Sequence, residues 1–418
     1  MQKKVLYYFL GVIIYRGILD LCYVQIIEPV FSYLGFVNEK TFQTSLTSWS
    51  LLLSLLPLSF TWLRRNKPSS NVLILMFLAS YVPFTSLVCF IPTCIKYIMS
   101  VCLYWICIWL IDSFLPKFKF SVYVNDSKIL FYAIYVYIFI IFYVSGKYTG
   151  FRLNFSFKNI YDLRFEAREF NIPIILEYIL AASRGLLPIF LVYCWDKKKY
   201  LWTAIIFFSI ILNFGIGGNK SIVFLLILSL LGYKFYTNKI CNLYVWGMGG
   251  IGLLSLMEQF LFNTRFLGAN IMYRFFYIPP FLDRCFFDFF QSHEFDFFRQ
   301  GILRRFGFES SYERGIDFII SDIYFGMDGS RANNGLFSDA YMNMGIWGCI
   351  LMPLFLIFVL RLFDACARGI TMRLLFVPII VFFLDLRSGT LTIALLTGGL
   401  LFLMLMLYFF PRFKSEIK

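Results

Sequence analysis

The chain has 418 residues, of which 60% are hydrophobic and 15% are charged, and its formal net charge is +14. Soluble domains carry about a quarter charged residues, so the composition excludes an ordinary soluble protein, and we attribute the positive charge to membrane-flanking loops and not to nucleic acid binding. The single histidine, His293, excludes a multi-histidine metal site, and ten cysteines without paired spacing predict neither disulfides nor metal ligands, so we expect no metal and no cofactor.

Long apolar stretches recur along the chain, and a helix needs about 20 such residues to cross roughly 30 Å of hydrocarbon. The first stretch, 5–27, is too long for a cleavable signal peptide and lacks a small-residue cleavage site. The sequence therefore predicts an all-α polytopic membrane protein whose residues 1–418 form a single domain of about twelve transmembrane helices. The weakest candidates are 219–236 and 371–386, which is short and contains Pro378. The expected spans are 5–29, 46–63, 72–92, 94–111, 128–145, 173–194, 200–213, 219–236, 242–263, 344–363, 371–386 and 389–410.

The distribution of Lys and Arg predicts the orientation, because short cytoplasmic loops of membrane proteins are basic. Alternate connections, starting with the N-terminus, are short and basic, whereas the short connections between them are poor in Lys and Arg. Both termini are therefore expected in the cytoplasm, and the long connections 146–172 and 264–343 on the outer side. The basic residues of the expected cytoplasmic segments are Lys3 and Lys4; Arg64, Arg65 and Lys67; Lys117, Lys119 and Lys128; Lys197, Lys198 and Lys199; Lys234 and Lys239; Arg361, Arg368 and Arg373; and Arg412, Lys414 and Lys418.

The two long outer loops differ in their cations. The planar fork of Arg binds phosphate or carboxylate at two points, which favours recognition of pyrophosphate or acidic sugar by an Arg-only loop. The alternative is that these arginines pair with the ten carboxylates of the same loop. The first loop carries Lys147, Arg152, Lys158, Arg164 and Arg168. The second carries no lysine and eight arginines, at positions 265, 274, 284, 299, 304, 305, 314 and 331.

An aromatic stretch, 281–300, follows Pro279 and Pro280, which suit a helix start. Aromatic pairs alternate with charges in its sequence FLDRCFFDFFQSHEFDFFRQ. This pattern is typical of a helix lying in the membrane interface. Packing against the outer rim of the helix bundle explains it equally well.

Charged residues also lie within the expected spans, where such residues face a cavity or a partner. Arg16 and Asp20 are four apart and can neutralise each other, so we expect a structural pair. Arg184 lies near the middle of its span. Glu258, Asp385 and Arg387, like Glu177, lie at span ends, and the first three are expected near the outer boundary, where they can border a site.

A glycine-rich turn, 215–221, joins two spans on the outer side and contains Lys220. Its backbone amides and Lys220 can form an anion nest at the membrane surface. Short connections contain glycine in any case, so the turn has an ordinary structural explanation as well.

The end of the second loop reads IISDIYFG at 319–326 and NNGLFSDAYMNMGIWG at 333–348. About thirty residues here resemble the Wzy-type polymerases of O-antigen and capsule repeat units, which share the form Tyr-Phe-Gly, a gap, then Asn-x-Gly-x-Phe-x-Asp-Ala-Tyr-x-Asn-x-Gly-x-x-Gly. The turn at Lys220 resembles the family's Gly-x-Arg turn, with Lys in place of Arg. Arg304 and Gly315 also match the family's Arg and Gly eleven residues apart.

The residues of the matched segment can be interpreted without the resemblance. Ser338 is placed to cap the next helix, and Asp339 and Asn343 lie one turn apart on one face. Gly345 and Gly348 would allow a neighbouring helix to pack closely. A capped and well-packed helix start without a chemical role would explain the glycines completely and Asp339 in part.

The resemblance implies a fold like that of the O-antigen polymerases and ligases, which is of the GT-C type, in the inner membrane of a bacterium. The implied reaction moves a growing glycan from undecaprenyl pyrophosphate onto the incoming lipid-linked repeat unit at the periplasmic face. It needs a base at the acceptor hydroxyl and cations at the pyrophosphate. The candidate bases are Asp339, Asp322 and His293. The candidate pyrophosphate and sugar ligands are Arg265, Arg274, Arg304, Arg305, Arg331, Lys220, Arg152, Arg164, Tyr341 and Asn343.

Three alternatives stay open. An O-antigen ligase shares the overall layout, and a lipid-linked-sugar glycosyltransferase with an acidic first outer loop is disfavoured because 30–45 holds only Glu39. A non-enzymatic repeat-unit flippase would need no outer domain of 80 residues and would favour an internal repeat, which the halves of this chain lack. The expected partners of a polymerase are the membrane, the lipid-linked glycan, a chain-length regulator and a repeat-unit flippase.

Overall fold

A computed structural model describes residues 2–121, 128–152, 166, 169–217, 220–236, 240–327, 329–333 and 335–412. Within these ranges the regular structure is entirely helical, which confirms the predicted all-α class. Nine helices in the described part of the chain are long and apolar enough to cross a membrane. The described part of the protein is thus all-helical, and its apolar helices are compatible with a polytopic membrane protein.

The nine spans coincide with nine of the twelve expected segments. Several are continuous helices interrupted only by a wider π-helical turn, as in α4, η3 and α5. Their bounds are Lys3–Leu34 (α1, η1, α2 and η2), Phe42–Arg64 (α3), Pro68–Phe90 (α4, η3 and α5), Ile95–Phe114 (α6), Lys128–Thr149 (α7 and η4), Ile174–Asp196 (α9), Tyr200–Gly217 (α10), Ile240–Phe262 (α12) and Leu336–Cys366 (α15).

The three other expected segments are shorter than a full crossing. Helix α11 spans Lys220–Phe235 and α16 spans Met372–Ser388. The expected continuous span 389–410 is instead broken into α17 (Leu391–Leu395) and α18 (Leu400–Tyr408). Gly399, which directly precedes α18, has a φ of +82° in the left-handed region, so one helix cannot continue through it.

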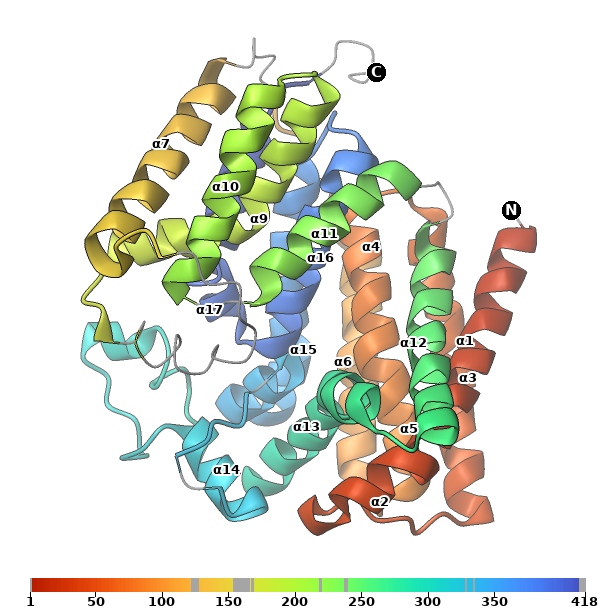
Figure 1. Ribbon diagram of the computed structural model, residues 1–418. Helices are drawn as coiled ribbons and strands as arrows, with labels where there is room; N and C mark the ends of the chain where they lie inside the picture. The colour runs from red at the N-terminus through yellow and green to blue at the C-terminus, as the bar shows by residue number, and fades with distance from the viewer. Residues whose placement is uncertain are drawn as a thin grey trace.

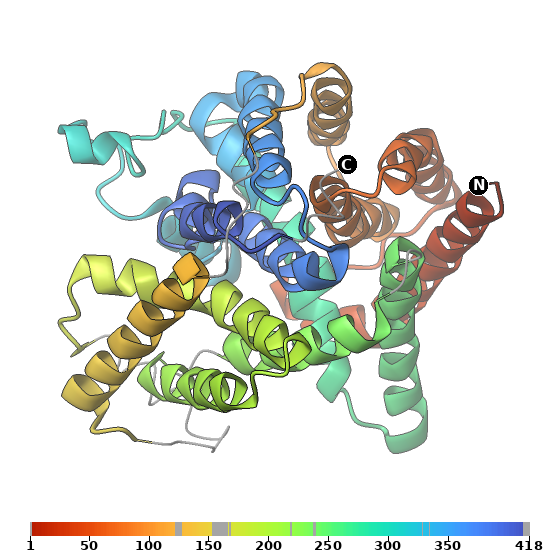
Figure 2. The ribbon, with the colours of Figure 1, turned by 90° about the horizontal axis from the view of Figure 1, so that it is seen from above.

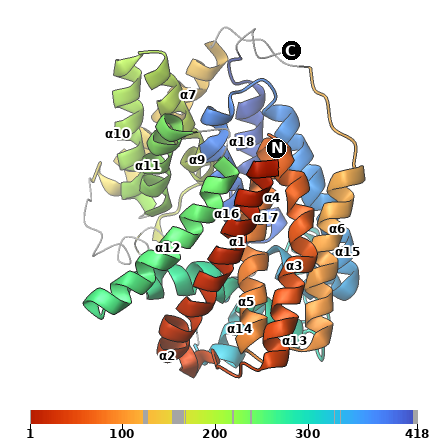
Figure 3. The same ribbon diagram turned by 90° about the vertical axis from the view of Figure 1, so that its right-hand side faces the viewer.

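The span Pro68–Phe90 forms the centre of the bundle, because 94% of its apolar window is buried inside the protein. Helices α3, α6, α15 and α16 surround it, with α3 against α5, α16 against α4 and α6 against α15 (Figures 1 and 2). Helix α1 packs along α12, and Figure 3 shows this pair side by side at the edge of the bundle. A second group, α7, α9, α10 and α11, packs on the other side of α16.

Several of the predicted cytoplasmic segments meet at one end of the bundle. Arg65 and Arg361 both pair with the carboxylate of Asp112, at 2.6 and 3.0 Å. Lys4 donates to the carbonyl of Leu63. Arg412 donates to the carbonyls of Cys366 and Arg368, so the first and last described segments share this end (Figure 1).

The second long loop forms a helical layer over the opposite end of the bundle. It contains η5 (Gly268–Tyr277), α13 (Ile278–Phe289), η6 (Leu303–Phe306), α14 (Ile316–Phe325) and the start of α15. Figure 1 places α13 and α14 at the end away from the N-terminus, together with α2 (Glu28–Phe31). Most of the first long loop, residues 153–165, 167 and 168, lies outside the described residues.

The first half of the aromatic stretch 281–300 packs against the bundle. Phe281, Phe286, Phe287 and Phe289 of α13 are buried, and Tyr97 of α6 donates its hydroxyl to the carbonyl of Pro280. Rim packing therefore accounts for 281–290. Of the residues that follow, Asp296 is fully buried and Phe297 is exposed.

The start of α15 corrects two predictions. The chain kinks at Gly345, whose φ of +57° and ψ of −134° are not helical. A Cβ on Gly348 would lie 1.8 Å from the carbonyl oxygen of Ala340. The lack of a side chain at Gly348 therefore makes room for the start of α15 itself and not for a neighbouring helix. The helix begins after Gly335 without a side-chain cap, and Ser338 makes a different contact.

Candidate functional site

Asp339 and Asn343 tie three segments together at the start of α15. The side-chain N–H of Asn343 donates to one carboxylate oxygen of Asp339 at 3.0 Å, and the backbone N–H of Leu391 donates to the other at 3.2 Å. The side-chain carbonyl of Asn343 accepts the backbone N–H of Phe298 at 2.6 Å. Both side chains are buried, so the predicted common face of Asp339 and Asn343 exists and faces the interior.

Tyr341, a predicted sugar ligand, lies within an aromatic cluster. Its ring stands 4.5 Å from that of Phe287 and 6.1 Å from that of Phe337, measured between ring centroids. Only 8% of the residue is exposed. The residue thus joins α13 to α15 by ring packing.

Asp283 of α13 lies against the same turn of α15. Ser338 donates both its hydroxyl and its backbone N–H to this carboxylate. Burial raises the pKa of Asp283 to about 6, although the bonds from Ser338 and the nearby Arg387 oppose this rise. Asp283 was not among the predicted site residues, because its meeting with Ser338 joins positions far apart in the sequence.

Arg387, at the end of α16, is buried without a hydrogen-bonding partner for two of its donors. Its guanidinium lies 3.8 Å from the centroid of the Phe275 ring, and only 8% of the residue is exposed. Nε and Nη2 have no acceptor among the described residues. A buried cation lacking acceptors is costly in free energy, and such residues in membrane proteins are candidates for binding an anion.

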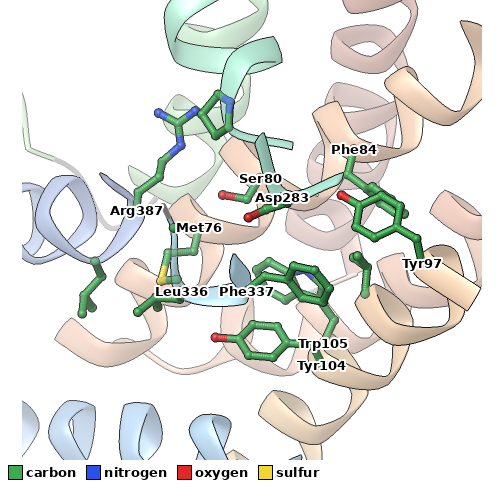
Figure 4. Close-up of a pocket in the computed structure, with 14 residues that line it drawn as sticks. Met76, Ser80, Phe84, Tyr97, Tyr104, Trp105, Asp283, Leu336, Phe337 and Arg387 are labelled. Atoms are coloured by element: carbon green, nitrogen blue, oxygen red, sulfur yellow. The ribbon is translucent and has the colours of Figure 1, made fainter. Parts of the chain in front are cut away.

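A cavity of about 40 Å³ separates these two groups (Figure 4). Asp283 and Arg387 line it from different helices, and Tyr97, Tyr104 and Trp105 are among the aromatic residues of its wall. In Figure 4 the carboxylate of Asp283 points toward the hydroxyl of Ser80. The volume holds about two water molecules, or a hydroxyl or phosphoryl oxygen, and is too small for a sugar ring.

The other two predicted bases lie away from this cavity wall. Asp322 is exposed on α14, and its carboxylate is 3.9 Å from Arg314. His293 is exposed and stacks on the ring of Phe289 at 3.9 Å, with its Nδ1 2.8 Å from the carbonyl oxygen of Phe289. A carbonyl oxygen only accepts, so this contact places a proton on Nδ1.

Pairing within the loop, the alternative considered for its arginines, occurs for four of those whose side chains the structure describes. Arg331 is one of the predicted ligands. Its guanidinium lies 3.6 Å from the carboxylate of Asp317 and pairs with it. The other three pairs are Arg284 with Asp288, Arg299 with Glu294, and Arg314 with Asp322.

The remaining predicted cations have varied surroundings. Arg265 donates to the side chain of Gln259 at 2.7 Å, and Arg152 pairs with Glu166 at 2.7 Å. Arg274 and Arg304 are exposed and form no ion pair with a described residue. The predicted ligands that lie outside the described residues, wholly or in their side chains, are Arg164, Lys220 and Arg305.

Two of the arginines within the expected spans, Arg16 and Arg184, form ion pairs. Arg16 contacts Asp20, as predicted, and also donates to Ser48 and Thr85. Arg184 donates to both carboxylate oxygens of Asp385. Arg387 differs from these arginines, since the carboxylate nearest to it in the cavity wall, Asp283, is bonded to Ser338.

The site at the loop-covered end of the bundle therefore consists of a partly accessible carboxyl, a buried guanidinium with free donors and an aromatic wall. The chain matches no protein-family model, no curated protein and no solved structure. A functional assignment is thus an argument from this site and from the sequence pattern beside it.

Proposed function

We propose that the protein polymerises undecaprenyl-pyrophosphate-linked oligosaccharide repeat units by glycosyl transfer at the loop-covered end of its bundle. The proposal includes about twelve membrane segments in a GT-C-like arrangement, a bacterial inner membrane and cytoplasmic termini. The observation that carries it is the placement of Asp283 and the unpaired Arg387 on the wall of one cavity, directly under the Arg-rich loop. A carboxyl group and a buried cation that line one cavity supply the two functions that transfer from a pyrophosphate donor requires, a base and a stabilising charge.

In the proposed reaction, the hydroxyl oxygen of the acceptor sugar attacks the anomeric carbon of the growing glycan. Asp283 accepts the hydroxyl proton as the new carbon–oxygen bond forms. The bond between the anomeric carbon and the pyrophosphate oxygen breaks, and its electron pair leaves with the lipid pyrophosphate. That leaving group is a stabilised anion, so no acid is needed to protonate it.

Arg387 stabilises the negative charge that grows on the leaving oxygen. Its free Nε and Nη2 donors are already oriented and desolvated, so they act without reorganisation during the reaction. The small cavity admits only the reacting oxygens. The sugar rings and the rest of the pyrophosphate lie outside it, toward the loop, where the exposed Arg274 is free to bind phosphate.

Access decides which carboxyl serves as the base. Both oxygens of Asp339 already accept N–H groups inside the fold, so we assign Asp339 and Asn343 to positioning α15, together with Tyr341. Asp283 is only partly buried and lines the cavity. Asp322 and His293 keep a place in the proposal as groups that contact sugars at the loop surface.

The other predicted cations complete the surface that we propose to bind the lipid pyrophosphate. Two of them, Arg152 and Arg331, are paired with carboxylates, and the substrate phosphate competes with these carboxylates for them. The remaining members of this set are Arg164, Lys220, Arg265 and Arg305.

Deletion of the gene, followed by electrophoresis of the surface glycan, tests the proposal. We expect a ladder of chain lengths to collapse to a single repeat unit, and the wild-type gene to restore it. Asp283→Asn should not restore the ladder, whereas Asp288→Asn, on the same helix but paired with Arg284, should do so. A ladder unchanged by the deletion would overturn the proposal, and loss of all glycan from the lipid core would indicate a ligase.

A further inference from the structure

Residues 297–309 form an arm that is closed at its base by Asp296. This side chain is fully buried, and its two carboxylate oxygens accept the backbone N–H of Gln300 and the hydroxyl of Ser310, both at 2.7 Å. The backbone N–H of Asp296 donates to the carbonyl of Met342. The base of the arm is therefore fixed to α15, and the arm is a defined part of the fold.

The arm exposes apolar side chains, in contrast to the buried aromatic residues of α13. Phe306 is 73% exposed and Phe308 55% exposed, and Phe297 and Ile302 are also exposed. Removing such a side chain from water is favourable. Four of them in one short segment form a surface that water solvates poorly and that lies beside the exposed, unpaired Arg304.

The backbone at the base of the arm is strained. Phe297 and Phe298 have φ values of +51° and +62°, in the left-handed region that bulky residues rarely adopt. The bond from the N–H of Phe298 to Asn343 holds this conformation. This left-handed conformation turns Phe297 outward. The strained backbone is thus associated with an exposed aromatic ring.

The position of the arm indicates what it meets. Seen along the bundle, the segment extends sideways beyond the helices (Figure 2). In Figure 1 it lies at about the level where α7 ends, at the loop-covered end. The helices of a membrane protein are surrounded by lipid, so a segment that extends sideways at the level of their ends lies over lipid headgroups.

We propose that this arm inserts its apolar residues into the headgroup region of the outer leaflet, with Arg304 bound to phosphates of anionic phospholipid. Amphipathic surface segments of aromatic and basic residues bind membranes in this way. The contact anchors the Arg-rich loop at the membrane surface. This contact with lipid does not depend on the proposed catalytic function, since any protein that carried this arm at a bilayer surface would make the same contact.

Fluorescence quenching of the full-length protein tests the inference. A fluorescent amino acid is incorporated at position 306, or at the exposed position 331 as the matched control, and the protein is reconstituted into vesicles of phosphatidylethanolamine and phosphatidylglycerol. Doxyl-labelled lipids quench from the headgroup side of the acyl chains, and iodide quenches from water. We expect doxyl lipids to quench the probe at 306, and iodide to quench this probe severalfold less than the probe at 331. The probe at 331 should be quenched by iodide and little by doxyl lipids.

Equal iodide quenching at both positions would overturn the inference, because the arm would then lie in water. Protection of position 306 from both quenchers would also overturn it, since protein would then cover the arm. Arg304→Glu should reduce doxyl quenching at 306 in vesicles that contain phosphatidylglycerol and leave it unchanged in phosphatidylcholine alone. If doxyl quenching at position 306 is the same in the Arg304→Glu variant and in the wild type in both kinds of vesicle, the proposed contact between Arg304 and lipid phosphate is wrong.

Discussion

Ser338, in the first turn of α15, donates its hydroxyl and its backbone N–H to the carboxylate of Asp283 on α13. These bonds favour the ionised carboxylate, while burial favours the neutral acid and raises the pKa to about 6. The contact also joins the loop layer to a membrane-spanning helix. A single side chain thereby couples the sequence segment that resembles the polymerases to the carboxyl that we propose as the base.

Ser338→Ala should shift the pH dependence of glycan elongation. Loss of the hydroxyl bond raises the pKa of Asp283 further, so the activity that depends on its ionised form should begin to fall at a higher pH than in the wild type. Initial rates measured between pH 5 and pH 8 check this, an interval chosen to bracket the pKa of about 6. Ser330→Ala, in an exposed turn, is the control, and an acidic limb at the same pH in both variants would contradict the role of Asp283.

Asp283→Asn should lower the elongation rate by at least about a hundredfold, which is the usual contribution of a general base. It should also change stability with a defined sign. Because the folded pKa of Asp283 is raised from the ordinary 3.8, the wild type loses stability as pH rises through about 6, and the variant does not. The Tm of the variant should therefore exceed that of the wild type above pH 6, and the two should agree below pH 4. A variant that elongates at the wild-type rate would remove Asp283 as the base.

Arg387→Met should separate stability from function. The guanidinium is buried with two unbonded donors, so an apolar side chain of similar length should leave the Tm in detergent unchanged or raise it. The elongation rate should fall by about a hundredfold or more, as expected when a preorganised donor is removed from a developing oxyanion.

Arg16→Met is the matched control for this prediction. Arg16 is also buried but contacts Asp20, Ser48 and Thr85, so its loss removes the cation that pairs with a carboxylate and two side-chain hydrogen bonds. This variant should be destabilised by about 3 kcal/mol or more. If Arg387→Met lowers the Tm as much as Arg16→Met, Arg387 is a structural residue.

Asn343→Ala should destabilise the protein by about 2 kcal/mol, because the carboxylate of Asp339 and the N–H of Phe298 lose a buried partner. Thermal unfolding in detergent measures the loss. The comparison is Asn270→Ala, since Asn270 is exposed and bonds only to a carbonyl one turn earlier. Equal Tm values for the two variants would show that the three segments do not depend on Asn343.

The sequence predicted those features that depend on local pattern. Apolar length located nine spans, and the four-residue spacing placed Arg16 beside Asp20 and Asp339 beside Asn343. Each of these predictions uses only the period of a helix.

The cavity depends on contacts between distant segments, and the pattern does not contain them. Asp283 meets Ser338 across 55 positions, and Arg387 reaches the same cavity from a later helix. The breaks at Gly345 and Gly399 depend on a positive φ, which an apolar pattern does not reveal. The sequence places Arg387 near a span end, but only the packing around it shows that Nε and Nη2 lack acceptors among the described residues.

The most direct test of the central claim is elongation by the purified protein in vesicles supplied with a repeat unit on undecaprenyl pyrophosphate. The account predicts products of two or more repeats, with one lipid pyrophosphate released for each bond formed, and neither with Asp283→Asn. Transfer of the lipid-linked unit across the vesicle membrane without any lengthening would contradict the account and identify a transporter.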